Sequence, residues 1–312
     1  MRKLDRREFL GSIAGLGASI FIGGCAGKIE SNGASFPSRG SSFAAKDLAV
    51  ASGKDPARNV RAAVDALGGM KKLVSSGDFV VIKPNIAWNR PADAAATTNP
   101  EVVAELVKMC KECGASRILV VDHIIDKPAE AVLNFTGIRP ASENAGAEVT
   151  AAQNESDYRS VEIPKGKLIK SNTCIKDILK ADVFINVPIA KAHSSTKLTL
   201  GMKNLMGCNW NRQAWHASSS LDQCIADYAG AVRADLVVLD ANRILLTNGP
   251  KGPGETKVVE QVIAGVDQVA VDAYGATLFG TTPKDIGYIR LAHEAGLGEI
   301  DPRKINRKEV RT

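Results

Sequence analysis

The chain has 312 residues, of which 45% are apolar, so it is long enough to bury a large core as one large domain or two small ones. Its formal net charge is only +6, and aromatic residues make up 5% of the chain. A weak basic excess without a stripe of interleaved basic and aromatic residues argues against a nucleic-acid-binding protein.

Residues 1–25 have the pattern of an export signal rather than of a folded element. Arg6 and Arg7 form a twin-arginine motif, and the glycine-rich apolar segment after them is too short for a stable membrane-spanning helix. The segment ends in the sequence IGGC, which resembles a lipobox and predicts lipidation of Cys25. We expect export by the twin-arginine translocase and a lipid anchor that holds the protein on the membrane, facing the periplasm or cell exterior. The alternative is a cytoplasmic protein with a fortuitous apolar N-terminus.

Residues 26–45 are rich in Ser and Gly and predict a flexible tether, which leaves residues 46–312 as the predicted domain. The twin-arginine route carries proteins that have already folded, often around a cofactor. A bound cofactor is therefore compatible with this signal, although the signal does not require one.

Short apolar runs alternate with amphipathic segments along the domain. Helices are expected at 56–67, 100–113, 127–135, 175–179 and 221–229 and after residue 269. Strands are expected at 79–83, 118–122, near 149, and at 160–163, 183–187 and 236–240, with a loop and short helices after 187. This alternation predicts an α/β fold, in which a mainly parallel sheet is covered by helices and two lobes share a central crevice.

Polar residues follow four of the predicted strands. In open α/β sheets, ligands bind outside the carboxyl ends of the strands, so these residues are expected to face one crevice. They are Lys83 and Asn85 after the first strand, Asp122 and His123 after the second, His193 and its neighbours after the strand at 183–187, and Asp240 and Asn242 after the strand at 236–240.

The densest group of donors lies between residues 189 and 216. His193 stands among hydroxyl and ammonium groups, which favours proton transfer or metal ligation over core packing. Arg212 lies one helical turn before His216, where the two side chains together suit a carboxylate or phosphate. We expect Lys83, His193, Lys203, Arg212 and His216 to converge on one pocket. A polar surface loop with solvated lysines is the structural alternative.

The chain also resembles a known family in seven segments that run through most of the predicted domain. They are DLAVASGKDPARNVRAAVDALGG, VVIKPN, TTNPEVV, KAHSSTKLTLGMKNLMG, NRQAWH, NGPKGPG and VAVDA. In these segments the chain resembles the domain of unknown function 362 (DUF362) family. The resemblance implies a fold and a site but no reaction, because the activity of the family is not established.

A more distant resemblance is to the nickel-pincer lactate racemases. It rests on a His after an early strand, a second His, a Lys ten residues later and a third His beyond it. The resemblance implies that Lys203 anchors a nickel-containing cofactor, that His216 ligates the metal, and that His123 and His193 exchange a proton with the substrate. A free Lys203 would instead bind an anion.

Two acidic residues have expected supporting roles beside such a cofactor. A ligating His usually donates its other ring N–H to an acceptor, and Asp240 or Asp272 is expected to be that acceptor for His216. Asp272 is otherwise expected to cap or orient a loop.

Two functions stay open at this point. The first is an enzyme acting on a small anionic organic acid, with or without a metal-containing cofactor, in which His193 and His123 are catalytic and Lys203, Lys83, Asn85 and Arg212 bind the cofactor. The second is a non-catalytic exported lipoprotein that binds an anion or a metal.

Overall fold

The computed structural model describes residues 43–44 and 47–312, so the predicted signal, its Cys25 and most of the predicted tether lie outside the described residues. The strands are β1 (Asp47–Ser52), β2 (Phe79–Pro84), β3 (Arg117–Asp122), β4 (Glu148–Ala151), β5 (Tyr158–Glu162), β6 (Ser171–Ile175), β7 (Val183–Val187), β8 (Ile189–His193), β9 (Lys197–Thr199), β10 (Leu236–Leu245), β11 (Thr256–Gly265) and β12 (Asn306–Arg311).

The helices are α2 (Pro56–Leu67), α3 (Pro100–Glu112), α4 (Ala129–Phe135), α5 (Ile138–Ala145), α6 (Lys176–Lys180), α7 (Gly201–Asn204), α8 (Gln213–His216), α9 (Leu221–Ala231), α10 (Gln268–Thr277) and α11 (Gly287–Glu294). Short 3-10 helices are η1 (Met70–Lys72), η2 (Ala92–Ala94), η3 (Glu155–Asp157), η4 (Leu205–Cys208), η5 (Pro283–Asp285) and η6 (Pro302–Lys304).

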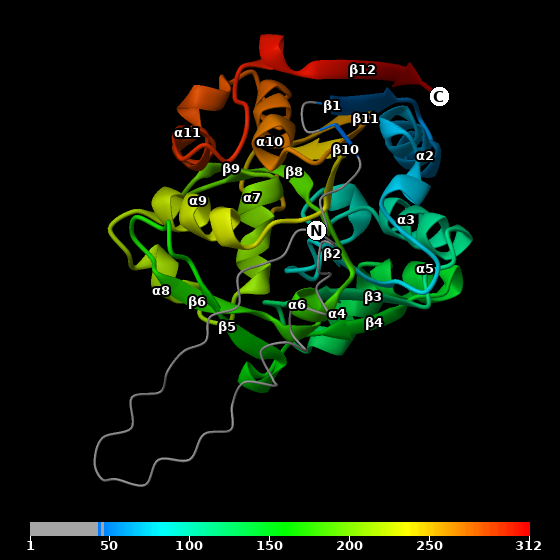
Figure 1. Ribbon diagram of the computed structural model, residues 1–312, viewed down its shortest axis with the longest axis horizontal. Coiled ribbons are helices and arrows are strands. Elements are labelled where there is room, and N and C mark those ends of the chain that lie inside the picture. Colours follow the sequence, from blue (N-terminus) through cyan, green and yellow to red (C-terminus); the bar gives the residue numbers. More distant parts are fainter. Residues whose placement is uncertain (1–42, 45–46) are drawn as a thin grey trace, which may run out of the picture.

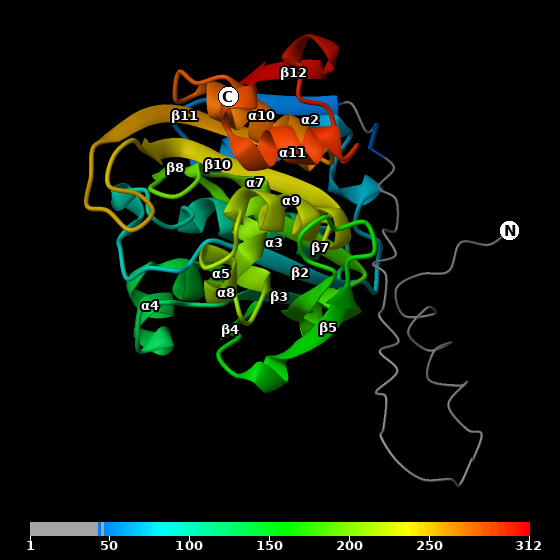
Figure 2. The ribbon, with the colours of Figure 1, turned by 90° about the vertical axis from the view of Figure 1, so that its left-hand side faces the viewer.

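A 10-stranded sheet organises the fold, with the order β12-β1-β11-β10-β7-β2-β3-β4 and with β8 and β9 attached beside β10 (Figure 1). The neighbours from β10 through β7, β2 and β3 to β4 pair in parallel, whereas β11 runs antiparallel to β10 and β1. The predicted α/β class with a mainly parallel sheet is confirmed. A separate two-stranded sheet, β5-β6, lies at one end of the molecule (Figure 2).

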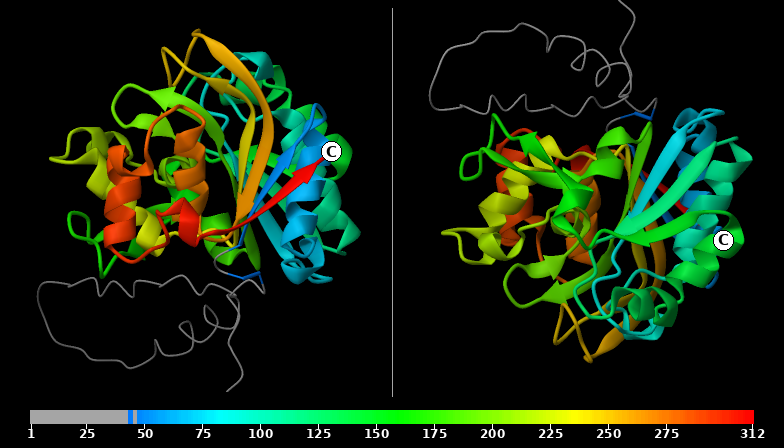
Figure 3. Two further views of the ribbon diagram at one scale, coloured as in Figure 1. Left: turned by 90° about the horizontal axis from the view of Figure 1, so that it is seen from above. Right: turned by 90° about the horizontal axis from the view of Figure 1, so that it is seen from below.

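Helices cover both faces of the sheet (Figure 3). Val80 and Ile82 of β2 pack into the apolar core on one face, together with residues of α2 and α3, whereas Phe79 and Val81 pack into the core on the other face with residues of α9 and α10. Because alternate side chains of the central strands enter a core on either side, these strands appear in the sequence as continuous apolar runs.

Local capping explains why two helices begin where the sequence predicted them. The Asp55 side chain accepts from the backbone N–H of Arg58 at the start of α2, which ends at Gly68 with a left-handed φ of 117°. Asn99 caps α3 by accepting from the backbone N–H of Glu101 at 2.8 Å. A proline follows each cap, at a position where a helix needs no N–H.

The sequence prediction was incomplete on one side of the sheet. Strands β1, β11 and β12 were not predicted, and the loop after residue 187 contains the hairpin β8-β9 as well as short helices. The strand predicted at 236–240 continues to Leu245, because β10 pairs along its length with β11 and bulges between Ala241 and Arg243. Within the described ranges, no helix combines the length and apolarity needed to span a membrane.

Candidate functional site

A cavity of about 380 Å³ lies at the carboxyl ends of β2 and β3 and is also lined by the segment that follows β7. The seven described residues that the sequence analysis expected to be catalytic, to bind a cofactor or to ligate a metal all line it: Lys83, Asn85, His123, His193, Lys203, Arg212 and His216. The predicted convergence on one pocket is therefore observed, and the roles assigned to these residues stay predictions. Parallel strands explain the convergence, since their carboxyl ends meet at one edge of the sheet.

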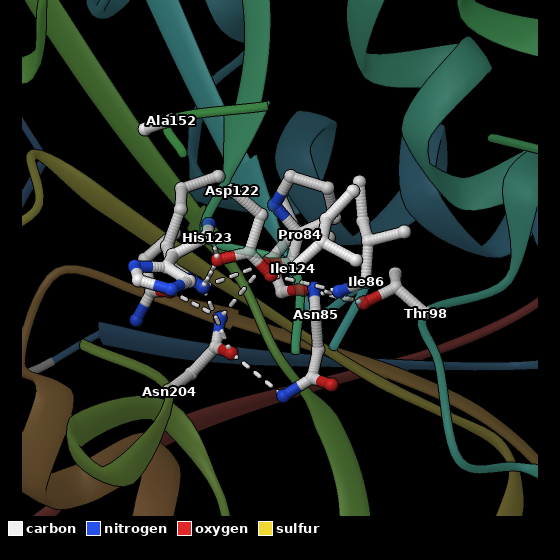
Figure 4. A network of polar contacts seen from close by, with 12 residues as sticks. Pro84, Asn85, Ile86, Thr98, Asp122, His123, Ile124, Ala152 and Asn204 are labelled. Atoms are coloured by element: carbon white, nitrogen blue, oxygen red, sulfur yellow. Dashed lines mark hydrogen bonds and ion pairs between the residues drawn. The ribbon is translucent and has the colours of Figure 1, made fainter. Parts of the chain in front are cut away.

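A buried ion pair forms the floor of the cavity. Lys83 Nζ lies 2.7 Å from Asp122 Oδ1, and the two side chains are 1% and 2% exposed. The other oxygen of Asp122 accepts from the backbone N–H of Ile86, and Oδ1 accepts from the backbone N–H of His123 (Figure 4). Asp122 thus ties the segment after β2 to the end of β3 while it neutralises the buried ammonium group.

Three asparagine side chains continue this network into the interior. Asn85 Nδ2 donates to Asn204 Oδ1 at 2.9 Å (Figure 4). Asn204 Nδ2 donates in turn to Asn186 Oδ1 at 2.8 Å. Lys191 Nζ donates to Asn85 Oδ1 at 3.1 Å and also to the backbone oxygen of Ala96. The amide nitrogen and the amide oxygen of Asn85 therefore both form hydrogen bonds, and through them Asn85 orients Asn204 and Lys191.

Lys203 and Arg212 bring positive charge to the cavity without an ion-pair partner of their own. Neither forms an ion pair with a carboxylate among the residues that the structure describes. Lys203 is 7% exposed, and its Nζ donates to the Met206 sulfur at 2.9 Å. Burial, followed by the charge of Arg212, lowers the pKa of Lys203 to about 7. Burial and the charge of Lys203 likewise lower the pKa of Lys191 to about 7.

His193 and His216 lie with parallel rings, 6.4 Å apart between centroids and 11° between planes. Burial is the main cause that lowers the pKa of both residues, and the positive charge of Lys203 adds to it. The pKa of His193 falls to about 3. Both imidazoles are therefore neutral near pH 7, the form that accepts protons or binds metals.

His123 enters the cavity wall from the end of β3. Its Nδ1 lies 2.8 Å from the Tyr158 hydroxyl, and its ring packs 5.6 Å from the Trp210 ring. Burial, together with the charge of Arg212, lowers the pKa of His123 to about 4. Arg212 Nη1 also donates to the backbone oxygen of His123 at 3.4 Å. The sequence did not single out Tyr158, which lies just before a predicted strand, or Trp210, which lies in the segment after residue 187 but has no titratable side chain.

The structure corrects the expectation for Asp240 and Asn242. Asp240 accepts from the backbone N–H groups of Asn99 and Asn242. The side chains of Asp240 and Asn242 border a second cavity of about 400 Å³ and not the first. The reason is that β10 continues past Asp240, so this residue lies within a strand and not at a strand end.

Asp272 is also not an acceptor for His216. Its two carboxylate oxygens accept from the backbone N–H groups of Gly201 and Met202, at 2.6 and 2.9 Å. The expectation that Asp272 caps or orients a loop is confirmed, whereas the expectation that Asp240 or Asp272 supports a ligating His216 is wrong. No hydrogen bond to the His216 ring is present within the described part of the chain.

A metal ion held by protein side chains alone does not fit the described residues. Among them, no three His, Cys, Asp or Glu side chains are grouped closely enough to hold one. Lys203 and His216 nevertheless line the same cavity, and a group that brings its own donor atoms requires only one ligand from the protein.

Comparison with known proteins identifies the family. The model of a family described as Domain of unknown function (DUF362) matches residues 80–277, well over half of the chain. The chain belongs to this family. The match contains all seven cavity residues that the sequence singled out.

Two individual proteins are similar to the chain. The thylakoid-associated protein sll1697 of Synechocystis is 27% identical over 252 residues, which cover 77% of this chain and 74% of that protein. The lactate racemase apoprotein of Thermoanaerobacterium thermosaccharolyticum matches in structure with a TM-score of 0.48 and 11% identity, over 73% of this chain and 56% of the racemase chain. Residue roles do not transfer at that level of structural similarity.

Proposed function

We propose that the protein is an enzyme that binds a small organic acid in the cavity and transfers a proton to or from it. The observation that carries this proposal is the charge balance of the site: Lys83, Lys191, Lys203 and Arg212 line the cavity, and Asp122 is its only carboxylate among the described residues. An anionic ligand would supply the missing negative charge, and it would raise the depressed pKa values of Lys191 and Lys203.

The size and composition of the cavity support a small ligand. About 380 Å³ lies at the lower end of the range for small-molecule sites, and the walls combine apolar side chains such as Trp88 and Ile125 with the polar groups. Two neutral imidazoles, His123 and His193, border the same space and supply proton acceptors and donors next to a bound acid.

Calorimetry with a panel of small acids tests the binding step. Lactate, malate, succinate and inorganic phosphate are titrated into wild type, Lys203→Met and Arg212→Met. Arg290→Met is the matched control, because Arg290 of helix α11 does not line the cavity. We expect one class of acid to bind to wild type and to the control, and each cavity variant to lose at least tenfold in affinity. Absence of binding by every acid would overturn the proposal.

Solvent exchange separates an enzyme from a binding protein. The bound acid is incubated with wild type in deuterated water, and loss of its carbon-bound proton signal is followed by NMR. We expect exchange that His123→Gln and His193→Gln abolish while binding persists. Binding without exchange in wild type would favour the alternative, an exported lipoprotein that only captures the anion.

A metal-containing group held by Lys203 and His216 is the second candidate. Both side chains face one cavity, and burial keeps the His216 imidazole neutral, as a metal ligand must be. When bound, such a group would supply Lewis-acid chemistry, and nickel is one metal compatible with an imidazole ligand. Elemental analysis and intact mass of natively expressed protein, with Lys203→Ala and His216→Ala alongside, test this. Wild type without stoichiometric metal or added mass on Lys203 would exclude it.

We also propose that the protein acts outside the cytoplasmic membrane. The twin-arginine motif and the lipobox-like sequence that ends at Cys25 support export and lipid anchoring. The name of the Synechocystis relative, which associates it with thylakoids, is compatible with a membrane location.

A further inference from the structure

His123 and Tyr158 are joined by a hydrogen bond whose direction can be assigned. The Tyr158 hydroxyl lies 3.0 Å from the backbone oxygen of Ala152 and 2.8 Å from His123 Nδ1. A carbonyl oxygen only accepts, so the single proton of the hydroxyl is donated to Ala152. The hydroxyl oxygen must then accept, and His123 Nδ1 must carry the proton that it receives.

Burial keeps the Tyr158 hydroxyl protonated and limits movement of the two rings. Tyr158 is 3% exposed, and burial raises its pKa, so the phenol retains its proton. The Trp210 ring packs 5.5 Å from the Tyr158 ring and 5.6 Å from the His123 ring, which holds both in position. The two rings are therefore oriented by packing as well as by the hydrogen bond.

The opposite edge of the His123 ring belongs to the cavity. His123 lines the cavity whereas Tyr158 does not, so the Nδ1 edge is turned away from the cavity and the Nε2 edge is turned toward it. Nε2 makes no hydrogen bond within the described part of the chain. A neutral ring with its proton on Nδ1 has its free lone pair on Nε2.

His193 is held in the other tautomer. The backbone N–H of Ser195 donates to His193 Nδ1 at 3.1 Å, and a backbone N–H cannot accept. The neutral His193 ring therefore carries its proton on Nε2. Two neutral imidazoles of opposite tautomer therefore border one cavity. His123 has a free lone pair on Nε2 that can accept a proton, and His193 has an Nε2–H that can donate a hydrogen bond.

We infer that Tyr158 is a positioning residue that locks His123 in the Nδ1–H tautomer and so presents Nε2 as the proton acceptor to the cavity that His193 also borders. The tautomer itself does not depend on the proposed function, whereas its catalytic use rests on that function. In that use, a ligand C–H or O–H proton moves to His123 Nε2, and the electron pair stays on the ligand anion.

Nitrogen NMR of labelled full-length protein near pH 7 tests the tautomer directly. The chain has only 4 histidines, so His123→Gln and His193→Gln variants suffice to assign the two rings of interest. Protonated and unprotonated ring nitrogens resonate far apart. We expect His123 protonated on Nδ1 and His193 protonated on Nε2. His123 protonated on Nε2, or on both nitrogens, in the wild-type protein would overturn the inference.

The role of Tyr158 is tested by Tyr158→Phe. Removing the hydroxyl leaves His123 Nδ1–H without an acceptor, so we expect the proton to shift to Nε2, which faces the cavity. Tyr274→Phe is the matched control, because Tyr274 loses a hydroxyl bonded to Gln261 far from His123 in the fold. If Tyr158→Phe folds and leaves the His123 signals unchanged, Tyr158 has only a packing role.

Ligand binding and proton exchange separate this inference from the proposed function. We expect Tyr158→Phe to lower the rate of solvent exchange about 10- to 100-fold with unchanged acid affinity. If no acid binds but His123 has the Nδ1–H tautomer, the proposed function fails and the positioning role stands. If an acid binds and exchanges while His123 has the Nε2–H tautomer, the positioning role fails alone.

Discussion

Asp122 is the residue on which the geometry of the cavity floor depends most. It pairs with the Lys83 ammonium group and accepts from the backbone N–H groups of Ile86 and His123. Removing one partner of a buried ion pair leaves the other charge uncompensated, whereas removing both charges avoids that cost. The two substitutions are therefore expected not to be additive.

We expect Asp122→Asn to destabilise the protein by about 3–5 kcal/mol, because it leaves Lys83 charged and buried without a carboxylate. Asn at this position keeps a carbonyl oxygen that accepts from a backbone N–H. The double variant Lys83→Met/Asp122→Asn is expected to recover part of the loss. Urea unfolding of both variants measures this, and a double variant no more stable than Asp122→Asn would contradict it.

The buried ammonium group of Lys203 is expected to destabilise the ligand-free protein while it provides positive charge for a bound anion. Its pKa is about 7 in the fold, against 10.5 in the unfolded chain, so the unfolded chain binds more protons between these values. The free energy of unfolding of wild type therefore rises as the pH increases from about 7 to 10.5. Below pH 7, Lys203 is charged in the fold, and its burial destabilises the protein to the full extent. Each unit of depressed pKa corresponds to roughly 1.4 kcal/mol.

Lys203→Met removes this cost and keeps a side chain of similar length. We expect the ligand-free variant to be more stable than wild type at pH 6, and the difference to shrink at pH 9.5. Urea unfolding at the two pH values is the measurement, and Lys257→Met, at an exposed position of β11, is the control with no expected pH dependence. A Lys203→Met variant that is less stable than wild type at both pH values would contradict the prediction that burial of the Lys203 charge destabilises the protein.

At the scale of elements, the loop between β10 and β11 reaches the cavity and contacts the segments that follow β2 and β3. Lys251 Nζ lies 3.0 Å from Asp126 Oδ1 and 5.3 Å from the centre of the Trp88 ring. Arg90 Nε donates to the backbone oxygen of Lys251 at 3.2 Å, and Pro250 lines the cavity. Segments after β2, β3 and β10 thus meet over the site, where the long hairpin reaches them (Figure 2).

We expect Lys251→Met to speed the dissociation of a bound acid several-fold with little effect on stability. Exposed ion pairs contribute only about 0–1 kcal/mol, yet this one holds the loop whose Pro250 lines the cavity. Stopped-flow dissociation gives the rate, and Arg303→Met removes a matched exposed ion pair to Asp301 away from the cavity. Equal dissociation rates in wild type and Lys251→Met would show that the ion pair does not retain the ligand.

A short helix also depends on its distant neighbour. Asp272 of α10 caps α7 through Gly201 and Met202, and a Cβ added to Gly201 would lie 2.7 Å from Asp272 Oδ1. α7 carries Lys203, so the position of this ammonium group is set by a contact between segments 71 residues apart. The glycine is required here by close approach rather than by an unusual φ.

At the scale of the whole molecule, the cavity sits on a domain that we propose to be tethered to a membrane. We expect metabolic labelling with a fatty-acid analogue to modify wild type and to leave Cys25→Ala unlabelled and released from membranes. Cys113→Ala is the control, since Cys113 lies within the folded domain and its loss leaves the lipobox-like sequence intact. Label that persists on Cys25→Ala, or unlabelled wild type, would rule out the predicted anchor.

Local chemistry made much of the fold predictable. Apolar runs such as Val183–Val187 specify strands buried on both faces, and the Asp-Pro and Asn-Pro pairs before α2 and α3 specify where those helices begin. Strands β11 and β12 escaped prediction because many of their positions are polar, and because each pairs with β1 at the other end of the domain.

The sequence by itself determined the α/β class and the group of polar residues at the strand ends, because strand burial and helix capping depend on neighbours along the chain. Tertiary structure alone decided that Asp240 lies within β10 and borders another cavity, that Asp272 caps α7, and that Tyr158 bonds to His123. These contacts join segments far apart in sequence, as Asn85 and Asn204 do across 119 residues. Only the pairing and packing of the complete sheet bring such side chains within hydrogen-bond distance.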